Sequence, residues 1–355
     1  MQVACCFITL LSLFSFAHAD EDLFENAATQ FDKASKSQQD KYSAQAENQN
    51  SYWNDYKNRV MQKWSDGAIP ERKIYVKYFD DESTRIRVNY ESGEVIAETL
   101  LPKKDASESV AKEFLKNALN DVIDKDLNAK APVIAKDEIP TNGSSVEQSI
   151  KNLIDGVKPK ETETGTDHQE RQVYRITFKL TPNYIKKRAD KIRPLVEKWA
   201  NKYNLDPAFV LAIIRQESSF NPRARSWVPA YGLMQIVPFY AGKEVMTKVT
   251  GKTLTPDAEF LYDPEKNIMV GTTYLQLLRD DYFKNVSDEN TRRYLITCSY
   301  NWGPHRIKTA ISKGQLSTRL PASDVYNKLR KIAPVETSNY LERVTQFTSE
   351  FQGKK

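Results

Sequence analysis

Glu217 is the residue of this sequence whose surroundings best suit proton transfer. It stands near the end of the apolar segment 209–220, and Val210, Ile213 and Ile214 precede it by seven, four and three positions. In an α-helix this spacing places the carboxyl group on the same face as the aliphatic side chains. Burial there, together with the negative end of the helix dipole, favours the protonated form and raises the pKa. A carboxylic acid that holds its proton near neutral pH can act as a general acid.

The spacing alone leaves a second interpretation of Glu217 open. A glutamate at a helix end commonly turns its carboxylate outward to water. Other routes to catalysis have few residues to use, because the chain has only three cysteines and three histidines. These exclude a disulfide scaffold, a Cys-based zinc site and a histidine cluster, and a Ser-His-Asp or Cys-His enzyme would have to use His168 or His305.

Four motif blocks follow one another in the second half of the chain. They are Glu217-Ser218-Ser219-Phe220-Asn221-Pro222; Ser226 with Tyr231-Gly232-Leu233-Met234-Gln235-Ile236; Asp263-Pro264 with Asn267-Ile268, Gly271 and Tyr274-Leu275; and Ser299-Tyr300-Asn301-Trp302-Gly303, with Glu336 to Leu341 downstream. In this order they resemble the lysozyme-like catalytic domain of the lytic murein transglycosylases. The resemblance covers residues 183–355, roughly half of the chain, and the region before it is similar to that of a membrane-bound group of these enzymes.

The resemblance implies a role for each matching residue. Glu217 corresponds to the family's single catalytic acid/base, and Tyr340 to the tyrosine that faces it. Ser226 and Gln235 correspond to polar groups that line the sugar site. Tyr300 and Asn301 correspond to a Tyr-Asn pair at the cleft. No cofactor and no metal are implied.

The implied reaction cleaves the β-1,4 bond between MurNAc and GlcNAc of peptidoglycan without water and leaves a 1,6-anhydromuramoyl end. The resemblance matches one glutamate to a catalytic role and no second catalytic carboxylate is evident in the blocks, so the two-carboxylate scheme of most glycosidases is not supported. One alternative is a hydrolytic goose-type muramidase on the same fold. The other is a non-catalytic cell-wall-binding protein, which the joint presence of Glu217 and Tyr340 disfavours because binding needs neither.

The elements that must position these residues differ between the two halves. Within residues 20–182, apolar and polar side chains alternate near 74–78, 86–90, 95–100 and 174–180, which is typical of β-strands. Helices are expected at 110–122 and from Ser145 onward. The stretch 155–172 is interpreted as a loop. This predicts a small α+β domain, and because every motif lies after residue 210, we expect it to position the enzyme without taking part in the chemistry.

The second half is predicted to be helical throughout. Asp206-Pro207 and Asp263-Pro264 each supply an N-cap and a first-turn proline, and further helices are expected near 288–300, 321–331 and 337–349. The overall expectation is therefore an α+β protein, with an all-α lysozyme-like catalytic domain at 183–355. Trp227 and Trp302 flank motif residues, and burial is the favoured interpretation for both, with sugar stacking as the alternative. Cys298 is expected in the core, and His305 at the surface or as a helix cap.

The first 19 residues predict export. An apolar run at 5–16, too short to cross a bilayer, precedes Ala17-His18-Ala19, the small-residue pattern of a signal-peptidase site. A cut after Ala19 would deliver the protein to the periplasm, and Cys5 and Cys6 stand at the start of the apolar run instead of after it, which disfavours a lipid anchor. The net charge of +5 is too mild to mark a nucleic-acid binder. The expected partner is peptidoglycan glycan, bound by a monomer without a transmembrane segment, and association with the outer membrane or cell-wall machinery stays open.

Overall fold

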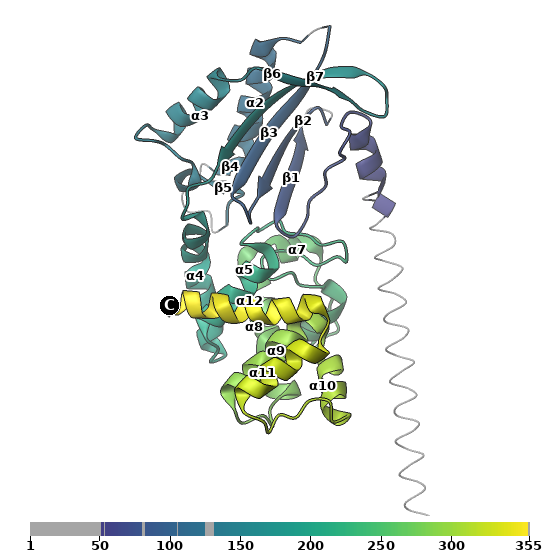
Figure 1. Cartoon of the computed structure of the whole chain (residues 1–355), viewed down its shortest axis with the longest axis vertical. Coiled ribbons are helices and arrows are strands. Elements are labelled where there is room, and N and C mark those ends of the chain that lie inside the picture. The colour runs from purple at the N-terminus through teal and green to yellow at the C-terminus, as the bar shows by residue number, and fades with distance from the viewer. Residues whose placement is uncertain (1–50, 53, 80–81, 105, 125–130, 354–355) are drawn as a thin grey trace, which may run out of the picture. The chain divides into compact units, whose positions relative to one another are not determined.

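The structure, a computed structural model, describes residues 51–353 except 53, 80–81, 105 and 125–130. Residues Asp55–Lys355 form one compact unit. Its first half holds an antiparallel sheet and its second half is helical (Figure 1), so the expected α+β class is confirmed. The expected signal peptide at 1–19 lies outside the described residues, and the domain boundaries at 20–182 and 183–355 stay predictions.

The sheet has five antiparallel strands in the order β1-β2-β3-β7-β6. Their bounds are β1 Ile74–Phe79, β2 Thr84–Asn89, β3 Glu94–Pro102, β6 Pro159–Thr164 and β7 Glu170–Lys179. Alternate side chains such as Ile86, Val88, Tyr174 and Ile176 form one core with helices α2 (Glu108–Val122) and α3 (Val146–Asp155). Ser145 caps α3 as expected, because its side chain accepts a hydrogen bond from the backbone N–H of Gln148 at 3.1 Å. A short parallel pair, β4 (Ile123–Asp124) and β5 (Ile134–Ala135), and the turn η1 (Lys136–Glu138) lie beside them.

The interpretation of 155–172 as a loop was wrong. This stretch contains β6, and β7 begins within it at Glu170. Strand β6 lies at the edge of the sheet and five of its six residues are exposed, so no apolar alternation marks it. An edge strand of this kind is held by its ladder of backbone hydrogen bonds, which leaves no pattern of side chains to recognise.

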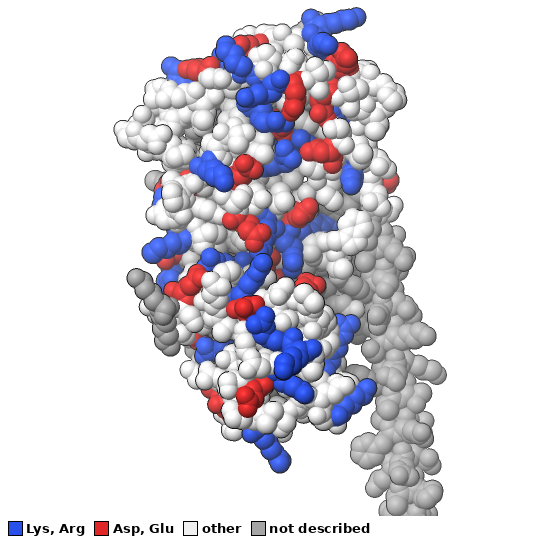
Figure 2. Space-filling view, in the orientation of Figure 1, with Lys and Arg blue, Asp and Glu red and all other residues white. Residues whose placement is uncertain are grey.

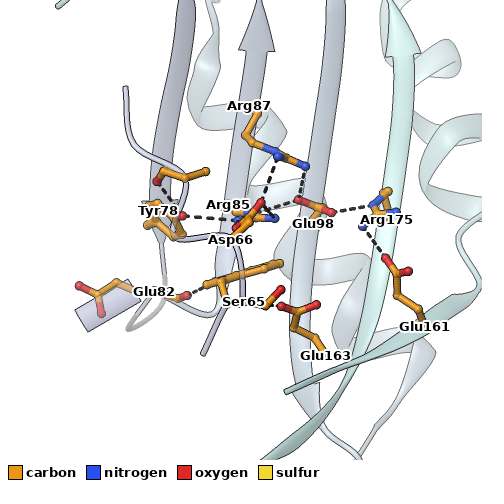
Figure 3. A network of polar contacts seen from close by, with 12 residues as sticks. Ser65, Asp66, Tyr78, Glu82, Arg85, Arg87, Glu98, Glu161, Glu163 and Arg175 are labelled. Carbon is orange, nitrogen blue, oxygen red and sulfur yellow. Dashed lines mark hydrogen bonds and ion pairs between the residues drawn. The ribbon is translucent and has the colours of Figure 1, made fainter. Parts of the chain in front are cut away.

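The other face of the sheet carries a buried network of charges (Figure 3). Glu98 is fully buried on β3 and accepts hydrogen bonds from Arg85 of β2 at 2.8 Å and from Arg175 of β7 at 2.6 Å. Arg85 also pairs with Asp66 and lies over the ring of Trp64, 3.7 Å from its centroid. Because a buried carboxylate is stable only when it is paired, the network holds the segment 64–66 against the sheet. The chain then runs from this segment directly into β1.

The helical half is built around α5, which packs against α4 and α12. The elements are α4 Tyr184–Lys202, α5 Pro207–Ser218, η2 Pro238–Gly242, α6 Lys243–Thr250, α7 Ala258–Tyr262, α8 Pro264–Leu277, η3 Leu278–Tyr282, α9 Glu289–Trp302, α10 Pro304–Ser312, α11 Ala322–Ile332 and α12 Val335–Phe351. The predicted starts of α5 and α8 are confirmed, since Asp206 and Asp263 each cap their helix through the side chain. The helices expected near 288–300, 321–331 and 337–349 correspond to α9, α11 and α12.

Arg188 of α4 connects the helical half to the sheet region. Its guanidinium donates to the carboxylate of Glu138 at 2.6 Å and to the carbonyl of Val133 at 2.8 Å, and lies over the ring of Tyr90. The two charged side chains are almost fully buried. On the face shown in Figure 2, acidic and basic side chains are interspersed over most of the surface. None of the helices in the described residues has both the length and the apolar character needed to cross a bilayer.

Candidate active site

Helix α5 delivers Glu217 into the protein interior. The helix starts at Pro207, where the Asp206 side chain accepts from the N–H of Ala208 at 2.9 Å, and its residues are almost all buried. It ends at Ser218, because Ser219 and Phe220 adopt left-handed backbone conformations with φ of 50° and 63°. Glu217 therefore lies in the last turn, near carbonyl groups that have no partner within the helix. Its residue exposure is 5%, which excludes the outward-turned arrangement.

The two carboxylate oxygens of Glu217 have different partners. The hydroxyl of Tyr340, on α12, donates a hydrogen bond to Oε1 at 2.7 Å. Nη1 of Arg72, in the segment that precedes β1, lies 3.7 Å from Oε2. Burial raises the pKa of Glu217 from its ordinary 4.5 to about 7, while the Tyr340 hydrogen bond and the positive charge of Arg72 lower it. Near neutral pH the group is thus poised between its acid and its base form.

Gln235 lies in a tight, buried turn between α5 and η2. Tyr231 and Ile236 pair across the turn, and Gly232, with φ of 73°, allows the chain to reverse. The Gln235 side chain donates to the carbonyl of Gly232 at 3.1 Å, while its buried Oε1 has no hydrogen-bond partner among the described residues. Buried polar atoms are nearly always paired, so an oxygen without a partner marks this turn as a candidate contact for a bound molecule.

The side chain of Asn267, on α8, holds this turn through hydrogen bonds to its backbone. Its Oδ1 accepts from the N–H of Met234 at 2.8 Å, and its Nδ2 donates to the carbonyls of Tyr231 at 2.8 Å and Leu261 at 2.7 Å. A fully buried amide with three backbone hydrogen bonds holds the turn in one conformation.

Tyr300 and Asn301, at the end of α9, form hydrogen bonds to the turn that holds Gln235 and to helix α12, respectively. The Tyr300 hydroxyl donates to the carbonyl of Met234 at 2.8 Å, next to Gln235. Burial and the nearby charge of Glu217 raise the pKa of Tyr300 well above its ordinary value. Asn301 accepts a hydrogen bond through Oδ1 from the hydroxyl of Thr337 at 2.7 Å, on the same helix as Tyr340.

The structure thus brings together most of the side chains singled out from the sequence. Glu217 and Tyr340 are in direct contact, and Tyr300 links the turn of Gln235 to the neighbourhood of Glu217. Ser226 is engaged within its own loop, where its hydroxyl bonds to the carbonyl of Val228 and accepts from the N–H of Ala230. Within the described residues, no three His, Cys, Asp or Glu side chains gather into a metal site.

Four flanking residues test the sequence interpretations further. Burial of Trp227, the favoured interpretation, was wrong, because its exposed fraction is 60% in a loop that presents the ring to solvent. Trp302 is half-buried and packs against the core, Cys298 is fully buried as expected, and His305 is exposed in the first turn of α10.

Arg72 was missed by the sequence analysis. No motif marks it, and it belongs to the region that was expected to take no part in the chemistry. No sequence signal near Arg72 points to the site, because the contact that holds its backbone joins residues 149 positions apart: the side chain of Asn221, in the first motif block, donates to the carbonyl of Arg72 at 3.2 Å. The sheet region therefore places a cation beside Glu217, and the expectation that this region takes no part in the chemistry stays a prediction.

Comparisons with known proteins cover both halves of the chain. The Transglycosylase SLT domain family matches residues 194–318, and the family "Membrane-bound lytic murein transglycosylase C, N-terminal domain" matches residues 29–133. The membrane-bound lytic murein transglycosylase C of Sodalis glossinidius (strain morsitans) is 31% identical over 297 residues, which are 79% of this chain and 83% of the relative. The protein of the same name from Yersinia pestis (strain Pestoides F) is 33% identical over 290 residues, which are 77% and 80% of the two chains. The solved structure of the 70 kDa soluble lytic transglycosylase from Escherichia coli matches with a TM-score of 0.37 at 27% identity, over 47% of this chain and 26% of that one.

Proposed function

Because the chain belongs to the lytic murein transglycosylase family, we propose that it cleaves the β-1,4 bond between MurNAc and GlcNAc of peptidoglycan without water, with Glu217 as its acid and base. The observation that carries the proposal is the state of this one carboxyl group. It is buried, it accepts a hydrogen bond from Tyr340, and its pKa is raised to about 7. A group with this pKa can give up a proton in one step and take one back in the next, near neutral pH.

In this reaction Glu217 gives one proton to the leaving group and takes a different proton from the C6 hydroxyl. The protonated carboxyl group transfers its proton to the glycosidic oxygen, and the bond from that oxygen to C1 of MurNAc breaks. The oxygen of the MurNAc 2-acetamido group bonds to C1 and stabilises the positive charge. The Glu217 carboxylate then removes the proton from the C6 hydroxyl, and O6 bonds to C1 as the acetamido oxygen leaves. The product is a 1,6-anhydromuramoyl end, Glu217 is protonated again, and no water is consumed.

The neighbouring residues have supporting roles in this scheme. The Tyr340 hydrogen bond fixes the orientation of the carboxyl group toward the scissile bond. The unpaired Oε1 of Gln235 suits the N–H of the acetamido group, which would hold the carbonyl oxygen of that group near C1. Tyr300 keeps the turn of Gln235 in place through Met234, and Asn301 and Ser226 lie on the flanking segments where further sugar hydroxyls would bind.

A hydrolytic reaction on the same fold is the competing proposal. One carboxylate near Glu217 could serve as the base that such a reaction requires. Glu336, exposed in the first turn of α12, raises the pKa of Glu217 through its negative charge. A hydrolase would need such a group, or another base, to activate water against C1. The Glu336→Gln variant should therefore keep its activity if the proposal is right.

Mass spectrometry of purified murein digested by the full-length protein tests the proposal. Anhydromuramoyl products from the wild type and from Glu336→Gln are expected. Products with reducing MurNAc ends, formed by the wild type and lost in Glu336→Gln, would establish the hydrolytic reaction instead. Absence of any soluble product, with glycan binding retained, would identify a cell-wall-binding protein.

The proposed substrate also suggests where the protein acts. Peptidoglycan lies in the cell envelope, and the relatives carry the words membrane-bound in their names. We place this protein in the periplasm, exported by the signal peptide at 1–19, as a monomer that acts on glycan strands close to the outer membrane. Fractionation of cells that express the full chain, with and without residues 1–19, tests this placement.

A further inference from the structure

We propose that Arg72 is a positioning residue for Glu217: its guanidinium orients the carboxylate and stabilises its ionised form, so the sheet region takes part in the catalytic step. The proposal rests on the function proposed for Glu217. It concerns a residue outside every motif block, in the segment that leads into β1.

The first argument is the division of the carboxylate between two partners. Tyr340 occupies Oε1 through a hydrogen bond of 2.7 Å, and Arg72 faces Oε2 with 3.7 Å between Nη1 and the oxygen. The second distance is that of an ion pair without a direct hydrogen bond, so Oε2 stays free to exchange a proton with substrate. One oxygen therefore anchors the group and the other is held beside a cation.

The second argument is that the backbone of Arg72 is held firmly. Asn221 is fully buried, and it donates through Nδ2 to the Arg72 carbonyl at 3.2 Å while its Oδ1 accepts from the N–H of Arg223 at 3.0 Å. The neighbouring backbone is also bonded, because the N–H of Tyr90 donates to the Lys73 carbonyl at 2.9 Å. The loop that ends α5 is thus tied directly to the segment that carries Arg72.

The third argument is the balance of charge around Glu217. From α12, Glu336 opposes ionisation and the Tyr340 hydroxyl favours it; Tyr300 faces the group from α9. From the segment before β1, Lys73 also favours ionisation, but it is paired with Glu91 at 2.8 Å. Among the described residues, Arg72 is the cation that forms an ion pair with Glu217.

The expected consequence follows from the sign of this interaction. Arg72 favours the carboxylate, so its removal raises the pKa of Glu217 and keeps the group protonated to higher pH. The alkaline limb of the kcat/KM profile, which reports loss of the general acid, should move upward. Because the Arg72 side chain is 40% exposed and partly screened, we expect a movement of roughly 0.5–1 pH unit. Loss of orientation should also lower the plateau rate, by about 3–30-fold.

The test compares full-length variants on purified, uncross-linked glycan strands between pH 5 and pH 9. Arg72→Gln and Arg72→Met both remove the charge and keep an unbranched, though shorter, side chain, so either one that melts near the wild-type temperature is sufficient. Arg72→Lys keeps the charge and should return the alkaline limb most of the way to its wild-type position. Arg59→Gln is the matched control, since Arg59 is an exposed arginine of the same region that pairs with Glu82, and it should leave the profile unchanged.

An alkaline limb that stays in place in the folded neutral variants overturns the proposal. So does a profile that moves equally in Arg72→Lys and in Arg72→Gln, because the effect would then be one of shape. Glu217→Gln, measured alongside, separates the two levels of inference. If it is inactive while Arg72→Gln has the wild-type profile, only the role of Arg72 is wrong; if it keeps its activity, the function proposed for Glu217 is wrong.

Discussion

Replacement of Glu217 by glutamine should remove activity and at the same time stabilise the protein in a pH-dependent way. Glutamine has the shape of glutamate and can still accept the hydrogen bond from Tyr340, but it can neither donate nor recover the catalytic proton. The rate of murein turnover should fall by at least the ~10²–10⁴-fold that one acid–base group contributes. The stability effect arises because a buried carboxyl group resists ionisation, whereas a neutral amide has no charge to desolvate.

The magnitude follows from the pKa of Glu217 in the two states. The unfolded chain ionises with the ordinary pKa of 4.5, and the folded protein with a pKa of about 7. Below the lower value both states are protonated, so the group contributes no pH dependence. As the pH rises from 4.5 to 7 the unfolded state loses its proton first, and the folded state becomes progressively less stable by comparison. The cost at pH 7 is about 3 kcal/mol, from 1.36 kcal/mol for each unit of difference.

Thermal melts of the wild type and Glu217→Gln at pH 4 and pH 7 measure this effect. The stability gained by the glutamine variant should be about 3 kcal/mol larger at pH 7 than at pH 4, which corresponds to an additional rise in melting temperature on the order of 5 °C. Glu259→Gln is a control, since Glu259 is exposed on α7 and its replacement should have the same small effect at both pH values.

Three results would refute the reasoning. An equal gain at both pH values would mean that the carboxyl group is not desolvated in the folded protein. Near-normal release of anhydromuropeptides by Glu217→Gln would remove the residue from its catalytic role. An inactive variant that melts well below the wild type at both pH values would make Glu217 a structural partner of the fold.

Three further variants test the surroundings of the site. Tyr340→Phe removes the hydrogen bond that lowers the pKa of Glu217, so the alkaline limb of the pH–rate profile should move upward and the rate should fall by roughly 10-fold; an unchanged profile would contradict the contact. Asn267→Leu removes three buried hydrogen bonds to the backbone, those to the Met234 N–H and to the carbonyls of Tyr231 and Leu261, and should lower the free energy of unfolding by about 3–5 kcal/mol in denaturant melts, whereas a loss below about 1 kcal/mol would show that the turn is held by other contacts. Arg188→Met leaves the buried carboxylate of Glu138 unpaired and should cost about 3–5 kcal/mol; the double variant with Glu138→Gln should recover much of this, and failure to recover it would mean that the pair is not the source of the loss.

The parts of the site that lie close together in the sequence could be predicted from it. The spacing of Val210, Ile213 and Ile214 before Glu217 reports which side of α5 is buried, because helical geometry relates residues three, four and seven apart. The caps at Asp206 and Asp263 are equally local, since each side chain bonds a backbone N–H two or three residues away. Neighbouring residues alone therefore predict the limits of the helix and the face on which Glu217 lies, while burial of its carboxyl group is decided by the structure.

Resemblance to a family extended the prediction to residues far apart in the chain. Tyr340 was expected to face Glu217 because its motif occurs in the right order, and spacing alone carries no such information. The structure adds the physical content, a hydrogen bond of 2.7 Å between α12 and α5, and the burial that raises the pKa to about 7.

Three features depended on the tertiary structure. Strand β6 has exposed side chains on both faces, so its place in the sheet comes from backbone pairing with β7. Trp227 is exposed because its loop turns outward, although an isolated tryptophan is more often buried. Arg72 meets Glu217 only because the buried charges around Glu98 and the amide of Asn221 hold its segment beside the end of α5. A local sequence pattern indicates which side of its own helix or strand a residue lies on. The packing of the elements determines which distant charged residue lies beside it.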